Sequence, residues 1–405
     1  MLYFCLWVGR GAQAKENAPP YSCPTPAHKG LTHVSTKVAP LPFEAPAPER
    51  GGRPLMYSLL PDELAGLGHN GSPDALFSKI QRVDTWLQGA PNLGKKSRAL
   101  LSQCTDDSLP EIESVHASQD GSSRLVLRTD DGHRFETVHM PRNTKNPRVT
   151  LCLSSQVGCA MGCTFCATGT MGIVRNLSAG EIVGQVLVTL REMGACTGHH
   201  LNLVFMGMGE PLHNLKQVEK ALQILCHPAG LGISPRRITV STSGLVTGIE
   251  KLAQSSPRPL LAVSVNHTTD EARAKVMPVN RKYPLARLKE TLHNWPLRNK
   301  ERITLEYVLL KGENDTDEDA KRLAAFAGDL ACHINLIPMN EHSRSDFHRP
   351  DDDHVQRFAR ELLSLGCLVF VRDSRGRDVA AACGQLVTGS TRRARKILPI
   401  EDGST

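Results

Sequence analysis

The sequence predicts an α/β protein, because strand-like and helical segments alternate regularly from residue 149 onward. Six short apolar runs are typical of strands, at 149–153, 201–206, 237–241, 259–265, 303–310 and 333–337. Helical stretches separate them, and a strand followed by a helix and a parallel strand forms a right-handed crossover. We therefore predict a parallel sheet that curls into a partial (β/α)6 barrel. A flat, doubly wound sheet is the alternative that periodicity leaves open.

Caps and spacing identify the helices of this region. The first begins at the capping box Ser178-Ala-Gly-Glu181 and continues with apolar residues at helical spacing, namely Ile182, Val183, Val186, Leu187 and Leu190. Further helices are expected after Asn214, Leu285 and Asp315. A last helix, at about 352–365, leads into an extra strand at 368–371.

A small α+β domain is predicted to precede the barrel, from Met56 to about Pro141. Its residues 57–64 and 75–87 are expected to form helices. Residues 125–138 contain two strand-like runs around Asp131-Gly132, and this dipeptide is a strong signal for a β-hairpin.

The first 55 residues hold nine of the 26 prolines and show neither the helical nor the strand periodicity of apolar residues. We therefore predict a disordered extension. A secretion signal is disfavoured, since the apolar stretch Leu2–Val8 is short and no basic residue precedes it. An organellar transit peptide is an alternative, but we favour a dispensable tail or translation from Met56. The predicted divisions are 1–55, 56–141, 142–382 and 383–405.

Composition is that of a soluble globular protein, with 40% hydrophobic and 22% charged residues. No apolar run reaches the roughly 18 residues of a membrane span, so we expect no membrane association. The net charge of +7 permits a polyanionic partner such as RNA without requiring one. Twelve cysteines in 405 residues are too few for a disulfide scaffold.

Three cysteines are the most informative feature of the chain. Cys159, Cys163 and Cys166 follow the first barrel strand in the spacing C-x3-C-x2-C. They supply one thiolate fewer than an ordinary four-cysteine iron–sulfur cluster needs, which leaves one iron open to a substrate or cofactor. Structural zinc usually requires a second pair of ligands further along, and no such pair is visible. An open cluster also favours a reducing, cytoplasm-like compartment.

Polar or glycine-rich segments follow the other predicted strands. They are Gly207-Met-Gly-Glu-Pro211, Ser241-Thr-Ser-Gly244, Ser264-Val-Asn266 and Asn340. Each alone is common loop chemistry, but the carboxyl ends of parallel strands meet at one rim. Glycines there allow a ligand close approach to the backbone, and Glu210 offers a carboxylate for a ligand ammonium group.

A second diagnostic segment follows the extra strand, where Cys383 stands in Ala-Cys-Gly-Gln-Leu386. Together with the cysteine motif, it closely resembles the RlmN/Cfr family of radical S-adenosylmethionine (SAM) RNA adenine methyltransferases. The segments Thr150–Cys159, Phe205–Pro211, Thr239–Gly244 and Leu336–Asn340 also look like that family. The resemblance covers roughly 56–387 and implies a radical-SAM barrel over residues 142–382.

The resemblance implies an enzyme with a [4Fe-4S] cluster and SAM as cofactors. Cys159, Cys163 and Cys166 would hold the cluster. The residues that match the family's SAM contacts are Gly209, Glu210, Ser241, Ser264, Val265, Asn266 and Asn340.

The family's chemistry assigns three further roles. A first SAM would methylate Cys383, and a second would be cleaved to a radical that takes hydrogen from the S-methyl group. The resulting carbon radical adds to the adenine ring, and Cys152 would release the product by forming a disulfide. Glu136 matches the proposed proton acceptor. From the residues alone, Cys152 would be a core residue and Glu136 a solvated one.

The expected activity is methylation of adenine carbon 2, with carbon 8 as the alternative, in ribosomal RNA and with transfer RNA as a second substrate. The small domain and the basic run 392–396 are candidate RNA contacts. We expect a cytoplasmic monomer reduced by flavodoxin or ferredoxin.

The chain departs from the family pattern at Asn266, where histidine is usual, and before about residue 124. These departures leave two alternatives open. One is a radical-SAM enzyme with another substrate, and the other is a noncatalytic RNA-binding protein with a structural metal.

Overall fold

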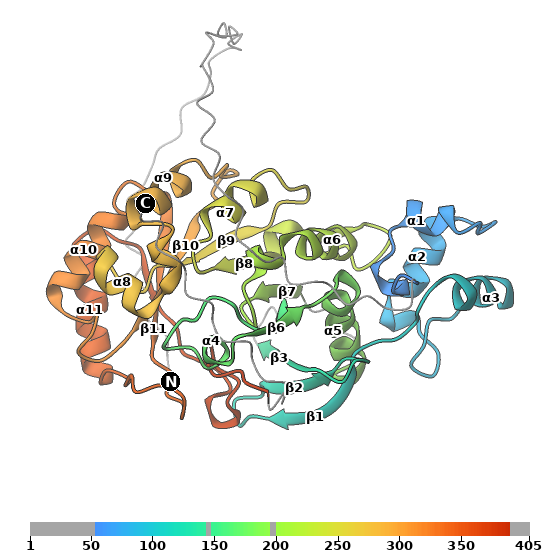
Figure 1. Ribbon diagram of the computed structural model, residues 1–405, viewed down its shortest axis with the longest axis horizontal. Helices are drawn as coiled ribbons and strands as arrows, with labels where there is room; N and C mark the ends of the chain where they lie inside the picture. The colour runs from blue at the N-terminus through green and yellow to red at the C-terminus, as the bar shows by residue number, and fades with distance from the viewer. Residues whose placement is uncertain (1–52, 143–146, 195–199, 389–405) are drawn as a thin grey trace, which may run out of the picture. The chain divides into compact units, whose positions relative to one another are not determined.

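The computed structural model describes residues 53–142, 147–194 and 200–388 (Figure 1). The predicted signal, transit or disordered extension up to residue 52 and the basic run 392–396 lie outside these ranges. Residues 53–55 are described, and Leu55 is buried and forms a bridge with Asp106. Within the described ranges, no helix is both long and apolar enough to cross a membrane.

The secondary structure alternates between strands and helices over most of the chain. The strands are β1 Glu111–Ala117, β2 Ser123–Arg128, β3 Arg134–Arg142, β4 Arg148–Cys152, β5 Gln156–Gly158, β6 Ile173–Asn176, β7 His200–Phe205, β8 Ile238–Thr242, β9 Leu260–Ser264, β10 Ile303–Leu309, β11 Cys332–Pro338 and β12 Val369–Val371. The helices are α1 Pro61–Gly66, α2 Pro73–Gln81, α3 Lys95–Cys104, α4 Ala167–Met171, α5 Ala179–Glu192, α6 Leu215–Cys226, α7 Val246–Leu252, α8 Asp270–Val276, α9 Leu285–His293, α10 Asp317–Ala327 and α11 Asp352–Ser364.

The strand order establishes the barrel topology. The main sheet runs β1-β2-β3-β4-β7-β8-β9-β10-β11-β12, and every pair from β4 to β12 is parallel. The six predicted strands are thus β4, β7, β8, β9, β10 and β11, and β12 is the predicted extra strand. A doubly wound sheet reverses its strand order at a switch point, and this order does not reverse. The partial barrel is confirmed and the flat alternative is wrong.

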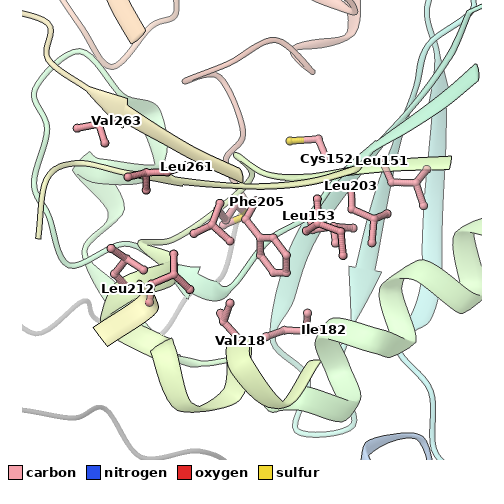
Figure 2. Packing of buried hydrophobic residues seen from close by; sticks show 14 of the residues in the cluster. Leu151, Cys152, Leu153, Ile182, Leu203, Phe205, Leu212, Val218, Leu261 and Val263 are labelled. Atoms are coloured by element: carbon pink, nitrogen blue, oxygen red, sulfur yellow. The ribbon is translucent and has the colours of Figure 1, made fainter. Parts of the chain in front are cut away.

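Alternation along each strand separates the two faces of the sheet. In β10, the residues at odd-numbered positions from Ile303 to Leu309 are buried, and those between them are only partly buried. The apolar face packs on the helices: Figure 2 shows Leu153 and Phe205 of the sheet region directed toward Ile182 of α5 and Val218 of α6. The opposite face carries the polar residues and lines the interior of the barrel.

The small domain differs from its prediction in its helices. The segment 57–64 is divided between a 3-10 turn at Met56–Ser58 and α1, because Pro61 begins a new helix at its first position. The predicted helix 75–87 ends early, since α2 closes at Gln81. The hairpin around Asp131-Gly132 is confirmed as β2 and β3. Its second strand pairs with β4 and so continues the barrel sheet.

The segment that carries Cys383 is fastened to the β1–β2 turn. The Asp120 carboxylate accepts a hydrogen bond from the Gly376 N–H at 2.8 Å, and Asp378 accepts one from the Ser118 hydroxyl at 2.6 Å. The chain after β12 therefore reaches across to the opposite end of the same sheet. This contact places Cys383 beside the carboxyl ends of the strands.

Candidate active site

The three clustered cysteines lie in the loop between β5 and α4, at the carboxyl-terminal rim of the barrel. Hydrogen bonds fix this loop at both ends: the Cys159 N–H donates to the Gly172 carbonyl at 3.0 Å, and the Cys166 N–H donates to the Cys163 carbonyl at 3.2 Å. Gly169 packs against the Cys163 backbone, where a Cβ would lie 2.7 Å from the carbonyl oxygen. The loop is thus a fixed scaffold that presents three thiols.

The electrostatics of these thiols suit a cationic ligand. Burial, followed by the neighbouring Cys166 thiol and the Glu210 carboxylate, raises the pKa of Cys163 to about 12. Burial and Cys163 likewise raise the pKa of Cys159. Thiolates gathered this closely repel one another unless a metal centre takes up their charge. The residues present therefore fit an iron–sulfur cluster.

Among the described residues, no three His, Cys, Asp or Glu side chains are arranged to hold a single metal ion.

The glycine-rich segment after β7 shows why glycine is required there. Gly209 has φ +101°, and a Cβ on it would lie 2.6 Å from the Gln156 side chain. A side chain on Gly207 would meet the Ser154 hydroxyl at 2.7 Å. Both glycines therefore allow this backbone to pack against Ser154 and Gln156. These two residues lie just before the cysteine loop in the sequence.

Glu210 is buried, but its carboxylate already has protein partners. It accepts hydrogen bonds from the Ser243 N–H at 2.8 Å, the Ser243 hydroxyl at 2.9 Å and the Leu212 N–H at 3.1 Å. Burial raises its pKa in spite of these donors. The predicted contact with a ligand ammonium group would therefore use the remaining acceptor capacity of a carboxylate that is held in place from both sides.

Ser241, Ser264 and Asn340 stand at neighbouring strand ends, as predicted. The Ser241 hydroxyl donates to Glu306 on β10 over 3.5 Å. The Asn340 amide nitrogen donates to the Cys383 carbonyl at 3.1 Å, while its oxygen is buried and has no hydrogen-bond partner among the described residues. A buried acceptor without a donor is costly, and a bound ligand would satisfy it. Asn340 thus links the proposed SAM site to Cys383.

Asn266 uses its side chain within the protein. Its oxygen accepts a hydrogen bond from the Val308 N–H at 2.9 Å, and its amide nitrogen lies 3.3 Å from the Met277 sulfur. Its φ of +55° falls in the left-handed region, which asparagine tolerates better than most residues. The backbone carbonyls of Asn266 and Val265 also accept hydrogen bonds within the protein, from the Asn314 amide at 2.7 Å and from Arg273 at 2.9 Å.

Cys152 and Cys383 come together inside the barrel. Figure 2 shows the Cys152 side chain on the side of the sheet opposite Leu151 and Leu153, so it does not point into the helix-facing core. Burial, and then the proximity of Cys383, raises the pKa of Cys152. Cys383 is exposed, but the many surrounding protein atoms and then Glu306 raise its pKa to about 11. Cys166 also contributes to this shift, so the cysteine segment lies near the cluster loop.

Glu136 is buried in β3, and burial is one way in which the pKa of a catalytic base is raised. It is 1% exposed, and burial raises its pKa to about 6, although Arg124 and the Val387 N–H partly offset this increase. Arg124 on β2 pairs with it at 2.5 Å, and the Val387 N–H donates to its other oxygen at 3.1 Å. The prediction that it is a solvated hairpin residue is wrong.

Three residues that the sequence did not single out belong to this arrangement: Arg124, Glu306 and Arg273. The hairpin register could have indicated Arg124, because it pairs Val126 with Glu136 and leaves Arg124 two residues away on the same face. Glu306 is an acidic residue within the apolar strand β10, where only an interior-facing position suits it. The sequence of α8 gives no comparable signal for Arg273. The roles of all the predicted site residues stay predictions.

Comparisons with known proteins agree with this geometry. The profile of the radical SAM superfamily matches residues 153–324. The dual-specificity RNA methyltransferase RlmN of Syntrophotalea carbinolica is 47% identical over 295 residues, which are 73% of this chain and 77% of that protein. The protein of the same name from Dinoroseobacter shibae is 40% identical over 374 residues, 87% of this chain and 94% of that protein.

A solved structure shows the same fold. The crystal structure of a radical SAM methyltransferase from Sphaerobacter thermophilus superimposes with a TM-score of 0.75 at 37% identity. It covers 84% of this chain and 100% of that one. This share is larger than the barrel alone. The chain belongs to the RlmN family of radical SAM methyltransferases.

Proposed function

We propose that this protein methylates carbon 2 of an adenine in RNA through an S-methylated Cys383. The observation that carries the proposal is the contact between the Cys383 segment and the cluster loop, where the Ala167 N–H donates to the Gly384 carbonyl at 2.7 Å. The contribution of Cys383 to the raised pKa of Cys152 supports the proximity of these two cysteines. The similar proteins are named dual-specificity RNA methyltransferases RlmN, which supports RNA as the substrate. The choice of carbon 2 over carbon 8, and of ribosomal RNA with transfer RNA as a second substrate, is part of this proposal.

The cofactors of the proposal are a [4Fe-4S] cluster on Cys159, Cys163 and Cys166 and SAM at the neighbouring strand ends. When bound, they would supply the methyl groups, one electron and the hydrogen-atom abstraction that polar chemistry lacks at an adenine carbon. Gly209, Glu210 and Asn340 would position SAM, the last through its unpartnered oxygen.

Cys383 would carry the methyl group to the ring. Its thiol must lose a proton to become the sulfur nucleophile that accepts the methyl group, and its raised pKa means that this proton needs an acceptor. Glu306 is the charged group that contributes most to the raised pKa of Cys383, so its carboxylate is the candidate acceptor of this proton. Asn340 holds the Cys383 carbonyl, so the sulfur stays at the rim while its side chain is modified.

Glu136 and Cys152 would complete the reaction. The radical adduct on the ring must lose one electron, for which the cluster would be the acceptor, and one proton, which Glu136 would accept. The Glu136 pKa of about 6 leaves it ionised at neutral pH while it remains basic enough to act. The Cys152 sulfur would then attack the Cys383 sulfur. An S–S bond forms, the bond from sulfur to the methylene carbon breaks, and its electron pair stays with that carbon, which takes up a proton.

We also propose the setting of the reaction. An open cluster and an unmodified Cys152 require a reducing, cytoplasm-like compartment and a low-potential electron donor such as flavodoxin or ferredoxin. We expect the enzyme to act as a monomer.

The direct test of this function is mass spectrometry of nucleosides from ribosomal and transfer RNA. The protein is expressed in a host that lacks its own homologue, and the Cys383→Ala variant serves as the control. New 2-methyladenosine with the wild type and none with the variant is expected. 8-Methyladenosine would contradict the regiochemistry, and neither product from protein with an intact cluster would indicate another substrate.

A further inference from the structure

Arg273 on α8 is a buried charge, and Asp270 at the start of the same helix is the carboxylate that acts on it. Its side chain is 0% exposed, and within the part of the chain that the structure describes it forms no ion pair. Its guanidinium instead donates to the carbonyls of Ser243 at 2.7 Å and Ser264 at 2.9 Å, to Val265 at 2.9 Å and to the Asn280 side chain at 2.8 Å. These neutral acceptors satisfy its N–H groups but leave its charge in place.

The position of Arg273 connects the two halves of the site. Three of its acceptors are backbone carbonyls of the β8 and β9 strand ends, where SAM is proposed to bind. One helical turn later, the Val276 carbonyl accepts a hydrogen bond from Thr164 at 3.1 Å. Thr164 directly follows Cys163 in the cluster loop. Helix α8 therefore holds the cluster loop and the strand ends at the same time.

The charge of Arg273 acts on that loop. Burial lowers the pKa of Arg273 to about 10, and Cys163 and Asp270 oppose this decrease. The hydrogen bond from Thr164 to Val276 places this cation's helix against the residue that follows Cys163.

We propose that Arg273 tunes the iron–sulfur cluster: its buried positive charge favours the reduced cluster, so the electron that starts the reaction is accepted more readily. The proposal rests on the cluster site of the proposed function. Arg273 would be a positioning residue, since it touches neither substrate nor the reacting sulfur.

Electrostatics predict that the charge of Arg273 makes the cluster easier to reduce. Three thiolates outweigh the charge of the oxidised inorganic core, so the protein-bound cluster is an anion, and one electron from a low-potential donor makes it more negative. No bond forms or breaks in this step. A fixed cation in a water-poor environment stabilises the more negative state more strongly. Removal of the charge should therefore make the cluster harder to reduce.

Two substitutions separate charge from hydrogen bonding. Arg273→Gln removes the charge and keeps some donors, whereas Arg273→Lys keeps the charge and loses the planar fork. Arg258→Gln is the control, because Arg258 is also partly buried but pairs with Glu301 at 3.2 Å and lies next to β9 at its amino-terminal end. Each anaerobically purified holoenzyme is titrated with dithionite, and the reduced cluster is followed by electron paramagnetic resonance.

At the wild-type midpoint, the ratio of reduced to oxidised cluster should fall at least tenfold in Arg273→Gln, which equals 59 mV for one electron. Arg273→Lys and Arg258→Gln should stay within threefold of the wild type. An unchanged ratio in Arg273→Gln, or an equal fall in Arg273→Lys, would overturn the proposal. If Arg273→Gln does not retain its cluster, Arg273→Lys decides: a ratio within threefold supports the role of charge, and a tenfold fall contradicts it.

This titration does not depend on the RNA substrate. A cluster with the predicted shifts and no methylated adenine would refute the proposed function and leave the role of Arg273 intact. Wild-type protein that holds no iron–sulfur cluster would refute both, and iron content separates these cases.

Discussion

The carboxylate of Glu136 accepts a hydrogen bond from the backbone N–H of Val387 at 3.1 Å. This contact joins the predicted proton acceptor to the segment that carries Cys383, across 251 positions of sequence. The Thr168 hydroxyl donates to the adjacent Leu386 carbonyl at 2.6 Å, and the Ala167 N–H donates to the Gly384 carbonyl at 2.7 Å. The base, the cluster loop and the cysteine segment are therefore parts of one hydrogen-bonded unit.

The buried carboxylate predicts a pH dependence of activity. The pKa of Glu136 is raised to about 6, so the residue is protonated below that pH and ionised above it. The rate of the RNA step should therefore rise with pH through about pH 6, and Glu136→Gln should lose roughly 10²- to 10⁴-fold at neutral pH. Single-turnover rates between pH 5 and pH 8 check this. An unchanged profile in Glu136→Gln would exclude the residue as the base.

Arg124 should control where that rise occurs. Removal of its charge in Arg124→Met leaves burial unopposed by the nearest cation, so the pKa of Glu136 and the inflection of the pH profile should move upward. Arg124→Lys retains a charge and should keep the inflection closer to that of the wild type. A profile of Arg124→Met that shifts toward acid would contradict the assignment of this ion pair.

Gly209→Ala should abolish SAM binding, because the new Cβ would lie 2.6 Å from Gln156 and the residue has φ +101°. We expect it to destabilise the fold by about 1–3 kcal/mol as well. Gly312→Ala is the matched control, since Gly312 has φ +75° but no atom within 4 Å of the position that a Cβ would take. SAM affinity by calorimetry and thermal unfolding should change in the first variant, and only unfolding should change in the second. Equal SAM affinity in both would show that the close approach is unimportant.

Much of the barrel could be predicted because its signals are local. Apolar runs identified the parallel strands β4 and β7 to β12, but not the short pair β5 and β6, and the Ser178–Glu181 capping box located the start of α5. The choice between a barrel and a doubly wound sheet depends on strand order, which local periodicity does not contain. The early end of α2 was missed because its apolar spacing continues through Trp86, which instead packs on Tyr57 at 6.0 Å between ring centroids.

The site was predictable where motifs name residues, as at Cys159, Cys163 and Cys166, and less so where charge depends on packing. Glu136 reads as a surface residue in a hairpin, and only the docked segment around Val387 buries it. Arg273 lies in a short helix with charged neighbours, and its burial follows from the carbonyls of two distant strand ends. Such residues depend on long-range contacts that one sequence does not reveal.

The measurement that tests the central claim most directly is a search for RNA bound covalently to Cys383. Cys152→Ala removes the thiol that is proposed to release the product, so protein purified from expressing cells should carry a nucleotide adduct on the Cys383 peptide by mass spectrometry. The wild type and the Cys152→Ala, Cys383→Ala double variant should carry none. Efficient RNA methylation by Cys152→Ala without any adduct would contradict the account.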